Sequence, residues 1–339
     1  MCGPRADSLF GRTLLVTLTV LAAAASARSS AQAPPDVPVA TRRAVSYLVA
    51  EVPRWRREHP CYSCHNNGDG ARALIEASRR NLVDLQRVDD AIGWLRSPER
   101  WALNSEDGGV KDLPLSRIQF SAALQALASA GAAEQGALDR AAALVVADQR
   151  PDGSWPISAT SNVGTPTGYG TPLATAVAMR LLAGSRTEAA GSARTRAGLW
   201  LRALEPQAVL EASAVLLGVG AASDEPAAAV RRKALDILRR GQAPDGGWGP
   251  YTTTPSEPFD TAVAMIALLT LRDNVSLAGP VLTPAGWRSA LDRGRAYLLA
   301  QQNDDGSWPE TTRPALQDSY SQRVSTTAWA LIALLDLER

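Results

Sequence analysis

The segment Cys61-Tyr-Ser-Cys64-His65 holds residue types and a spacing that could do chemistry by themselves. Two thiols three positions apart, followed at once by an imidazole, form the C-x-x-C-H pattern to which haem is attached covalently. The thiols form thioethers with the haem, and the adjacent histidine is placed to bind the iron. The sequence therefore predicts one covalent haem c, tethered by Cys61 and Cys64, with His65 as an axial ligand of the iron.

Three alternatives to haem attachment stay open for these residues. The cysteines could form a disulfide, either structural or redox-active. They could hold a metal such as zinc together with His59 and His65, although four ligands within seven residues would strain a tetrahedral site. The match could also arise by chance. We therefore treat haem attachment as the main hypothesis and the disulfide as the first alternative.

A second axial ligand for the haem iron could come from Met179 or Met265. Both methionines occupy the same position in two Thr-Ala-Val-Ala-Met segments. Methionine also fills gaps among small residues, so core packing is the competing role. If neither binds the iron, the haem would be open to small ligands.

Residues 1–27 have the order of an export signal. Arg5 and Arg12 precede the apolar run 13–25, and small residues follow at 25–27 and 31–33. This order is typical of a secretory signal peptide cleaved after position 27 or as late as 33, with an uncleaved anchor as the alternative. No later segment is apolar enough to span a membrane. The sequence thus predicts an exported protein, periplasmic or secreted, with Cys61 and Cys64 as its two cysteines.

The composition predicts a soluble, helical protein. Hydrophobic residues make up 45% of the chain, charged residues 20% and aromatic residues 5%, and 60 residues are alanine, the best helix former. The formal net charge is +1. A nearly neutral chain gives no electrostatic reason to expect a nucleic-acid partner.

A seven-residue pattern, Q-x-x-D-G-x-W, occurs three times, each time between two helical stretches. Asp-Gly favours a turn, and tryptophan can wedge against a neighbouring unit. Spacings of this order indicate stacked helical repeats. We therefore expect these motifs to be architectural: Gln149, Asp152, Gly153 and Trp155; Gln242, Asp245, Gly246 and Trp248; Gln302, Asp305, Gly306 and Trp308.

Polar helical stretches precede the motifs and alanine-rich stretches follow them, which predicts outer and inner helices. In the first, divergent repeat the segment 53–70 takes the place of the motif. Counting this repeat gives six helix pairs in one domain over residues 36–339. We expect the C-x-x-C-H segment to lie at the end of the ring where the Asp-Gly-x-Trp loops gather.

The three motifs resemble the QW repeat of the squalene–hopene cyclase and protein prenyltransferase superfamily, over roughly residues 85–339. The resemblance implies an all-α fold, an (α/α)6 toroid with concentric inner and outer rings of helices. Fold alone does not fix the reaction. After residue 65 the chain has neither His nor Cys, so the zinc site of the prenyltransferases is excluded.

In squalene–hopene cyclases the middle Asp of a D-x-D-D-T-A segment protonates the substrate. The nearest match is Glu257-Pro-Phe-Asp260-Thr-Ala, which makes Asp260 the acid candidate, with a helix N-cap as the alternative role. Few aromatic residues are available to stabilise a carbocation, and the chain has about half the length expected of two-domain cyclases. The single Asp in this segment, the small number of aromatic residues and the short chain all count against cyclisation.

Three functions follow. The first is an exported haem c protein in electron transfer or redox or ligand sensing, with a redox partner protein; residues 59–70 resemble the haem motifs of exported cytochromes c. The second is an enzyme of the terpenoid cyclase or transferase type with Asp260 as its acid. The third is a non-catalytic module that binds an isoprenoid or other apolar small molecule in the central cavity. The first is the main prediction.

Overall fold

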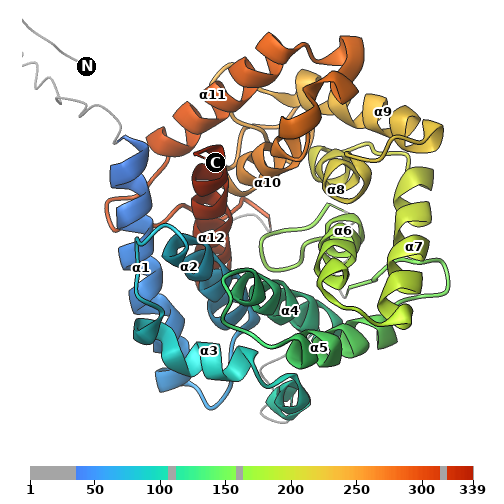
Figure 1. Ribbon diagram of the computed structural model, residues 1–339. Coiled ribbons are helices and arrows are strands. Elements are labelled where there is room, and N and C mark those ends of the chain that lie inside the picture. The colour runs from blue at the N-terminus through green and yellow to red at the C-terminus, as the bar shows by residue number, and fades with distance from the viewer. Residues whose placement is uncertain (1–35, 106–111, 158–162, 314–318, 339) are drawn as a thin grey trace, which may run out of the picture. The chain divides into compact units, whose positions relative to one another are not determined.

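The computed structural model describes residues 36–105, 112–157, 163–313 and 319–338, and all regular elements in these ranges are helices (Figure 1). Residues 1–35, which contain the predicted export signal, lie outside the described residues. Outer and inner helices alternate along the chain. The outer helices are α1 (Val37–Glu58), α3 (Asp89–Leu95), α5 (Gln135–Ala147), α7 (Glu188–Ala203), α9 (Glu225–Gly241) and α11 (Pro284–Ala300). The inner helices are α2 (Ala71–Ser78), α4 (Leu113–Ser129), α6 (Thr171–Leu181), α8 (Val209–Val219), α10 (Pro258–Leu269) and α12 (Tyr320–Leu337).

The inner helices of the unit from residue 36 onward form a closed ring. Each one packs against the next in chain order, and α12 returns to pack against both α2 and α1 (Figure 1). The outer helices surround this ring, and α5, α7 and α9 contact one another in turn. This is the (α/α)6 toroid that the repeats predict.

Side-chain size explains which helices lie inside. In α10, Pro258 to Leu268 are all buried, because neighbours cover this helix on every side. Its small residues allow the neighbouring helices to approach closely. In α9 the buried positions instead recur every three or four residues, as in a helix that buries one stripe and exposes the rest. The alanine-rich segments are therefore the inner wall.

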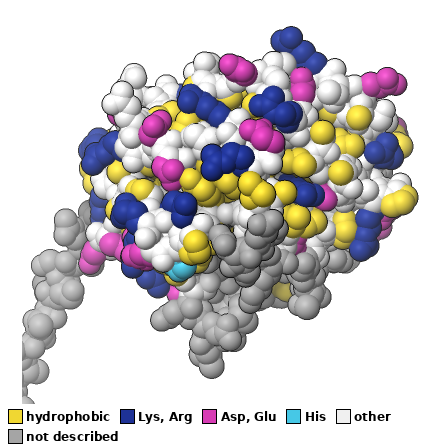
Figure 2. Space-filling view, turned by 90° about the horizontal axis from the view of Figure 1, so that it is seen from below, with side chains coloured by type: hydrophobic (Ala, Val, Ile, Leu, Met, Phe, Trp, Pro, Cys, Tyr) yellow, Lys and Arg dark blue, Asp and Glu magenta, His cyan; other side chains and the backbone are white. Residues whose placement is uncertain are grey.

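Short helices complete the ring. A π-helix, Cys64–Gly70, leads directly into α2, and 3-10 helices occupy Leu85–Val88, Pro98–Ser105, Leu182–Gly184 and Arg272–Val281. Within the described ranges no single helix has the length and apolar character of a membrane span. Pro258–Leu269 and Arg272–Val281 meet that description only when taken together, across a bend of 102°. On the face seen in Figure 2, basic and acidic side chains are interspersed.

Candidate functional site

The three Q-x-x-D-G-x-W loops share one set of contacts. Each indole Nε1–H donates to a carbonyl of the preceding outer helix, at 2.7–2.8 Å. Each tryptophan backbone N–H donates to a threonine hydroxyl of the following inner helix, at 2.8–3.1 Å. The glycines have φ between +91° and +97°, and a Cβ there would overlap the backbone of the next outer helix. These contacts fix each loop between the helices that it connects, which is a structural role.

The glutamines of the motifs connect each repeat to the next. Gln149 and Gln242 donate to carbonyl oxygens of the following outer helix, Ala193 and Ala290, at 2.9 and 2.8 Å. Gln302 donates to the carbonyl of Ala40 in α1, at 2.9 Å. The last motif therefore joins the last repeat to the first outer helix, and this bond helps to close the ring.

The C-x-x-C-H segment lies at the same end of the ring as these loops. We call this the N-terminal end, because the inner helices begin there. His65 contacts Ser325 of α12, two residues before Thr327, which receives the Trp308 N–H. Asn66 and Asn67 are buried and donate to carbonyls of α1, at 2.8 and 3.1 Å. The segment is thus fastened between α1 and α12.

The contacts of His65 fix its tautomer. Ser325 donates its hydroxyl hydrogen to Asp69 at 2.8 Å, so its oxygen accepts from Nδ1–H of His65, 3.2 Å away. Nε2 then accepts from the thiol of Cys64 at 3.6 Å. Burial lowers the pKa of His65 to about 4 and raises the pKa of Cys64, so both groups are neutral at pH 7.

Both imidazole nitrogens thus already have protein partners, and Cys61 and Cys64 are free thiols. This arrangement gives no support to His65 as an iron ligand, because an iron ligand needs one ring nitrogen free. Among the residues that the structure describes, no three His, Cys, Asp or Glu side chains are grouped to hold a metal ion. That finding gives no support to the alternative of a zinc site formed with His59.

Met179 and Met265 lie against the outer helices α7 and α11. A Cβ on Gly294 of α11 would meet the sulfur of Met265, and Cβ atoms on Gly198 and Gly218 would lie close to Met179. Both methionines therefore fill space between inner and outer helices. This position favours core packing and gives no support to the prediction that either one is a distal iron ligand.

Asp69, four residues after His65, is a buried carboxylate whose hydrogen-bond donors are all neutral side chains, with the charge of Arg72 nearby. It accepts from the hydroxyl of Tyr169 at 2.5 Å, from the amide of Gln119 at 2.8 Å and from Ser325. Burial raises its pKa to about 6, although these donors oppose that shift. Such a carboxyl can carry a proton near neutral pH, and its donors would stabilise the anion left after proton transfer.

The backbone around Tyr169 is built to place this hydroxyl. Tyr169 has φ +50°, which is rare for a residue with a large side chain, and Gly170 follows at φ +78°. A Cβ on Gly164 would overlap the Tyr169 backbone, so only glycine allows this close turn. Strained positions of this kind cluster at functional sites. The turn brings the phenol into the ring, where its side chain is 1% exposed.

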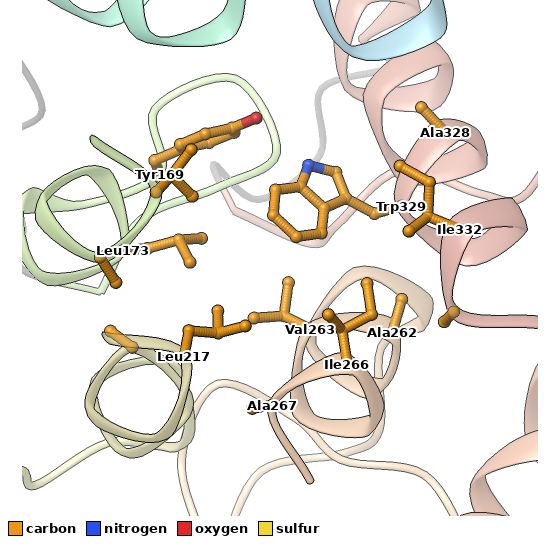
Figure 3. Packing of buried hydrophobic residues seen from close by; sticks show 14 of the residues in the cluster. Tyr169, Leu173, Leu217, Ala262, Val263, Ile266, Ala267, Ala328, Trp329 and Ile332 are labelled. Atoms are coloured by element: carbon orange, nitrogen blue, oxygen red, sulfur yellow. The ribbon is translucent and has the colours of Figure 1, made fainter. Parts of the chain in front are cut away.

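Aromatic rings meet beside Asp69 in the interior of the ring. Trp329 of α12 makes edge-to-face contacts with Tyr169 and Phe259, with ring centroids 5.6 and 6.0 Å apart (Figure 3). Figure 3 shows its indole projecting between Tyr169 on one side and Val263 on the other. Although the chain has few aromatic residues, three of them gather at this point. Their faces could stabilise a cation.

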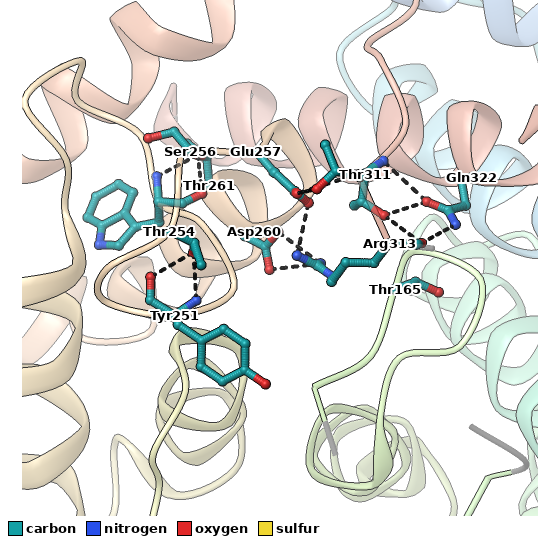
Figure 4. Close-up of polar contacts among 12 residues, drawn as sticks. Thr165, Tyr251, Thr254, Ser256, Glu257, Asp260, Thr261, Thr311, Arg313 and Gln322 are labelled. Atoms are coloured by element: carbon teal, nitrogen blue, oxygen red, sulfur yellow. Dashed lines mark hydrogen bonds and ion pairs between the residues drawn. The ribbon is translucent and has the colours of Figure 1, made fainter. Parts of the chain in front are cut away.

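Asp260 has a different environment (Figure 4). Arg313 donates to both of its carboxylate oxygens, at 3.0 and 3.2 Å, and to Glu257 at 2.9 Å. Burial and the neighbouring Glu257 raise the pKa of Asp260, and Arg313 opposes the shift. Asp260 lies in the first turn of α10 and is not its N-cap, which is Glu257. Because Arg313 binds both of its carboxylate oxygens, Asp260 forms a clamp that holds residues 311–313 against α10.

A cavity of about 190 Å³ lies at the opposite, C-terminal end of the inner helices. All six inner helices contribute to its wall, and Trp329 and Arg72 separate it from the Asp69 region. The lining is apolar on several sides and carries Arg72 and Arg180 among its polar groups. A second hollow, of about 530 Å³, adjoins it and shares Arg180, Leu217, Ile266 and Asp336 as walls.

Known proteins match both the sequence and the fold. Residues 191–315 match the family model of the squalene-hopene cyclase C-terminal domain. The chain is 30% identical to drimenyl diphosphate synthase of Streptomyces showdoensis over 257 residues, 72% of this chain and 37% of that protein. It is also 30% identical to lanosterol synthase erg7A of Aspergillus fumigatus over 115 residues, 32% of this chain and 14% of that protein. The chain thus spans well under half the length of these relatives.

Among solved structures the type II terpene cyclase MstE from Scytonema has the same fold. The apo form superposes with a TM-score of 0.51 at 15% identity, covering 89% of this chain and 98% of MstE. A variant of MstE in complex with its substrate, geranylgeranyl dihydroxybenzoate, gives 0.51 at 16% identity. The chain has the toroid of the squalene cyclase and prenyltransferase-like superfamily.

These matches correct the main functional prediction. An exported haem protein in electron transfer or sensing is wrong, because sequence relatives and fold neighbours alike are terpene cyclases. Covalent haem at Cys61 and Cys64 stays a prediction, which a pyridine haemochrome spectrum of the exported protein would test.

Sequence reasoning missed Asp69, Tyr169, Arg72 and Trp329 as a group. Asp69 stands just before an alanine-rich inner helix, as Asp260 stands at the start of another, and this shared position was the available signal. When the segment 257–262 is aligned with D-x-D-D-T-A, Phe259 takes the place of the protonating Asp. The motif position therefore holds no acid, and Asp69 is the better candidate.

Proposed function

We propose that the ring interior binds an isoprenoid chain and cyclises it by protonation, with Asp69 as the proton donor. The carboxyl O–H bond of Asp69 breaks and its proton bonds to an alkene carbon, whose π electrons form the new C–H bond. The resulting carbocation is attacked by the next double bond of the same chain. The cation finally loses a proton to a base, which restores the proton balance.

The environment of Asp69 carries this proposal. Four carboxylates of the described residues are buried: Asp69, Glu211, Glu257 and Asp260. Glu211 accepts from backbone N–H groups at the start of α8, and Arg313 binds the other two. Asp69 accepts from three neutral side chains and lies beside the aromatic cluster. It therefore combines a raised pKa with donors ready for its anion.

The relatives give independent support for the class of reaction. They carry the names of a drimenyl diphosphate synthase and a lanosterol synthase, and the similar fold belongs to a type II terpene cyclase. Trp329 is 2% exposed and contacts both the Asp69 region and the cavity. A substrate chain entering from the cavity would reach Asp69 by displacing this indole.

The test compares Asp69→Asn with Asp260→Asn. The protein is incubated with squalene, farnesyl diphosphate and geranylgeranyl diphosphate, and the extracts are analysed by gas chromatography and mass spectrometry. We expect cyclised product from the native chain and a loss of roughly 100-fold or more for Asp69→Asn, the scale of a general acid. Asp260→Asn should retain turnover in the fraction that is folded. Full activity in Asp69→Asn would overturn the assignment.

Binding without turnover is the second candidate, and the replacement of the protonating Asp by Phe259 favours it. In that case the same isoprenoids would bind in the ring and be recovered unchanged. Thermal stabilisation by a ligand together with unchanged ligand in the extract would identify a binding module. Thermal stabilisation together with a cyclised product would identify an enzyme.

A further inference from the structure

We infer that His65 is a positioning residue for the proposed acid: through Ser325 it keeps the acidic hydrogen of Asp69 on Oδ1, the oxygen that Tyr169 contacts. The inference deepens the proposed function and rests on it, because it takes Asp69 as the proton donor. The proposed reaction uses Asp69 and leaves the C-x-x-C-H segment without a role. The hydrogen bonds around His65 supply that role.

The two oxygens of the Asp69 carboxyl have different partners. Oδ2 accepts from the amide of Gln119 and from the hydroxyl of Ser325, both at 2.8 Å. Oδ1 accepts from the hydroxyl of Tyr169. Each carboxyl oxygen offers about two positions to hydrogens, so Oδ2 is filled, and among the described residues Oδ1 keeps one position for the acidic hydrogen. Oδ1 is also the oxygen on the side of the aromatic cluster, since Tyr169 packs against Trp329 (Figure 3).

Ser325 has one hydroxyl hydrogen, and the tautomer of His65 decides where this hydrogen points. With a hydrogen on Nδ1, the imidazole donates to the Ser325 oxygen 3.2 Å away, and Ser325 gives its own hydrogen to Asp69. With the hydrogen on Nε2 instead, Nδ1 becomes an acceptor and competes with Asp69 for the hydroxyl hydrogen. Oδ2 would then have an open position, and the acidic hydrogen could move to the oxygen on the Ser325 side.

Cys64 selects the tautomer that the chain of hydrogen bonds needs. Its sulfur lies 3.6 Å from Nε2 of His65, and as a free thiol it has a hydrogen to donate. A donor at Nε2 leaves the imidazole hydrogen on Nδ1, so the donors run in one direction, from Cys64 through His65 and Ser325 to Asp69. A thioether at Cys64 would have no hydrogen to donate, so covalent haem at this position and the chain of hydrogen bonds exclude each other.

The backbone brings these groups together in one short element. The π-helix Cys64–Gly70 carries both His65 and the acid, and both side chains contact Ser325, so they lie on the same side of it. A Cβ on Gly68 would lie 3.0 Å from the Cβ of Gln119, so this glycine lets α4 bring the amide close to the acid. Single π-helical turns are frequent at functional sites. The segment is therefore built around the acid.

Nitrogen-15 NMR of the full chain tests the tautomer without any substrate. The chain has two histidines, so labelling of the imidazoles gives two sets of signals, and His59→Gln assigns them. At pH 7 we expect the hydrogen of His65 on Nδ1, and Cys64→Ala should raise the share that carries it on Nε2. A native His65 with its hydrogen on Nε2 would overturn the inference.

Two substitutions of His65 separate the position of the donor from the bulk of the side chain. The amide of asparagine can donate near the place of Nδ1, whereas the amide of glutamine lies near the place of Nε2. We expect His65→Gln to raise the pKa of Asp69 by about 1, the effect of losing one hydrogen bond to an anion, and His65→Asn to leave it near the native value. Carbon-13 NMR of the Asp69 carboxyl, assigned with Asp69→Asn, measures these pKa values. Arg72, whose charge also acts on Asp69, is present in every variant.

Turnover of squalene, farnesyl diphosphate and geranylgeranyl diphosphate connects this role to the reaction. In His65→Gln we expect kcat to fall by about tenfold or more with KM unchanged, because the acidic hydrogen is then shared with Oδ2. The activity that remains should extend to higher pH, since the carboxyl with the raised pKa keeps its proton longer. His65→Asn should stay close to the native kcat, and His59→Gln is the matched control and should equal it.

The outcomes separate this inference from the proposed function. Equal pKa values of Asp69 in His65→Asn and His65→Gln would refute the positioning role even if isoprenoids are cyclised. The expected pKa difference with no product from any isoprenoid would leave the hold of His65 on Asp69 standing and refute catalysis. If His65→Gln does not fold, Ser325→Ala removes the same donor and should raise the pKa of Asp69 in the same way.

Discussion

Asp69 and Asp260 are both buried carboxylates at the N-terminal end of the inner helices, but they have opposite kinds of partners. Asp260 is bound on both oxygens by Arg313, which also binds Glu257. Asp69 accepts from a phenol, an amide and a hydroxyl. Burial raises the pKa of both carboxyls, to about 8 for Asp260 and about 6 for Asp69. The difference lies in the partners, because a guanidinium holds Asp260 in an ion pair and only neutral groups donate hydrogen bonds to Asp69. The resemblance to a motif therefore pointed to a carboxylate that is held by a guanidinium, and Asp69 is the proton donor that we propose in its place.

We expect the largest loss of stability when Arg313, which binds Glu257 and Asp260, is replaced. Arg313→Gln leaves two buried carboxylates without their cation, and breaking a buried pair in this way costs about 3–5 kcal/mol. Urea unfolding at pH 7 measures this loss in the free energy of unfolding. Arg323→Gln is the control, because Arg323 pairs with Glu310 at 3.1 Å in a more exposed setting and should cost about 1 kcal/mol or less. Equal losses in the two variants would contradict the assignment of a clamp.

The second effect depends on pH and concerns Asp69. Its pKa rises from 3.8 in the unfolded chain to about 6 in the folded protein, so the unfolded state holds fewer protons between these values. Stability from this group is therefore present at low pH and lost as the pH rises towards 6. We expect the native chain to lose about 2.4 kcal/mol relative to Asp69→Asn between pH 4 and pH 7.

Comparison with Asp69→Asn removes the contributions of the other groups. His65, whose pKa is lowered to about 4, works in the opposite direction and is present in both proteins, as is Asp260. The measurement is a series of urea unfolding curves from pH 4 to pH 8 for both chains. A difference in stability that stays constant with pH would show that Asp69 keeps an ordinary pKa.

The fold could be read from the sequence because its signals are local. A glutamine, an Asp-Gly turn and a tryptophan lie within seven residues, and most of their partners lie within one repeat on either side. The periodicity of these segments then gives the inner and outer helices. The same locality explains why the C-x-x-C-H segment attracted a functional prediction, since five consecutive residues contain the whole pattern.

The candidate site could not be read in this way. Gln119, Tyr169 and Ser325, the three donors to Asp69, are 50, 100 and 256 positions from it along the chain. They meet only because the ring closes, and no short pattern records that. The surroundings of His65 are hidden from the sequence for the same reason. Its partner Ser325 is 260 positions away and fixes the imidazole in a hydrogen-bonded position next to Asp69.

The smallest expected effect comes from removing one hydrogen bond to Asp69, the one that Tyr169 donates. Tyr169→Phe removes the donor at 2.5 Å from Asp69 and leaves the ring packed on Trp329. A hydrogen bond to a charged group contributes about 1.5–3 kcal/mol, so the loss should approach that range at pH 8, where Asp69 is ionised. At pH 5 the carboxyl is mostly protonated and the loss should be smaller. Urea unfolding of both chains at these two pH values measures the difference.

The missing donor also raises the pKa of Asp69 above its value of about 6 in the native chain, because the phenol stabilises the charged form. Tyr251→Phe, at a side chain that is 43% exposed, is the control and should change stability little at either pH. If the cost of Tyr169→Phe were the same at both pH values, the phenol would be a packing group with no hold on the charge of Asp69, and the contrast with the clamp at Arg313 would disappear.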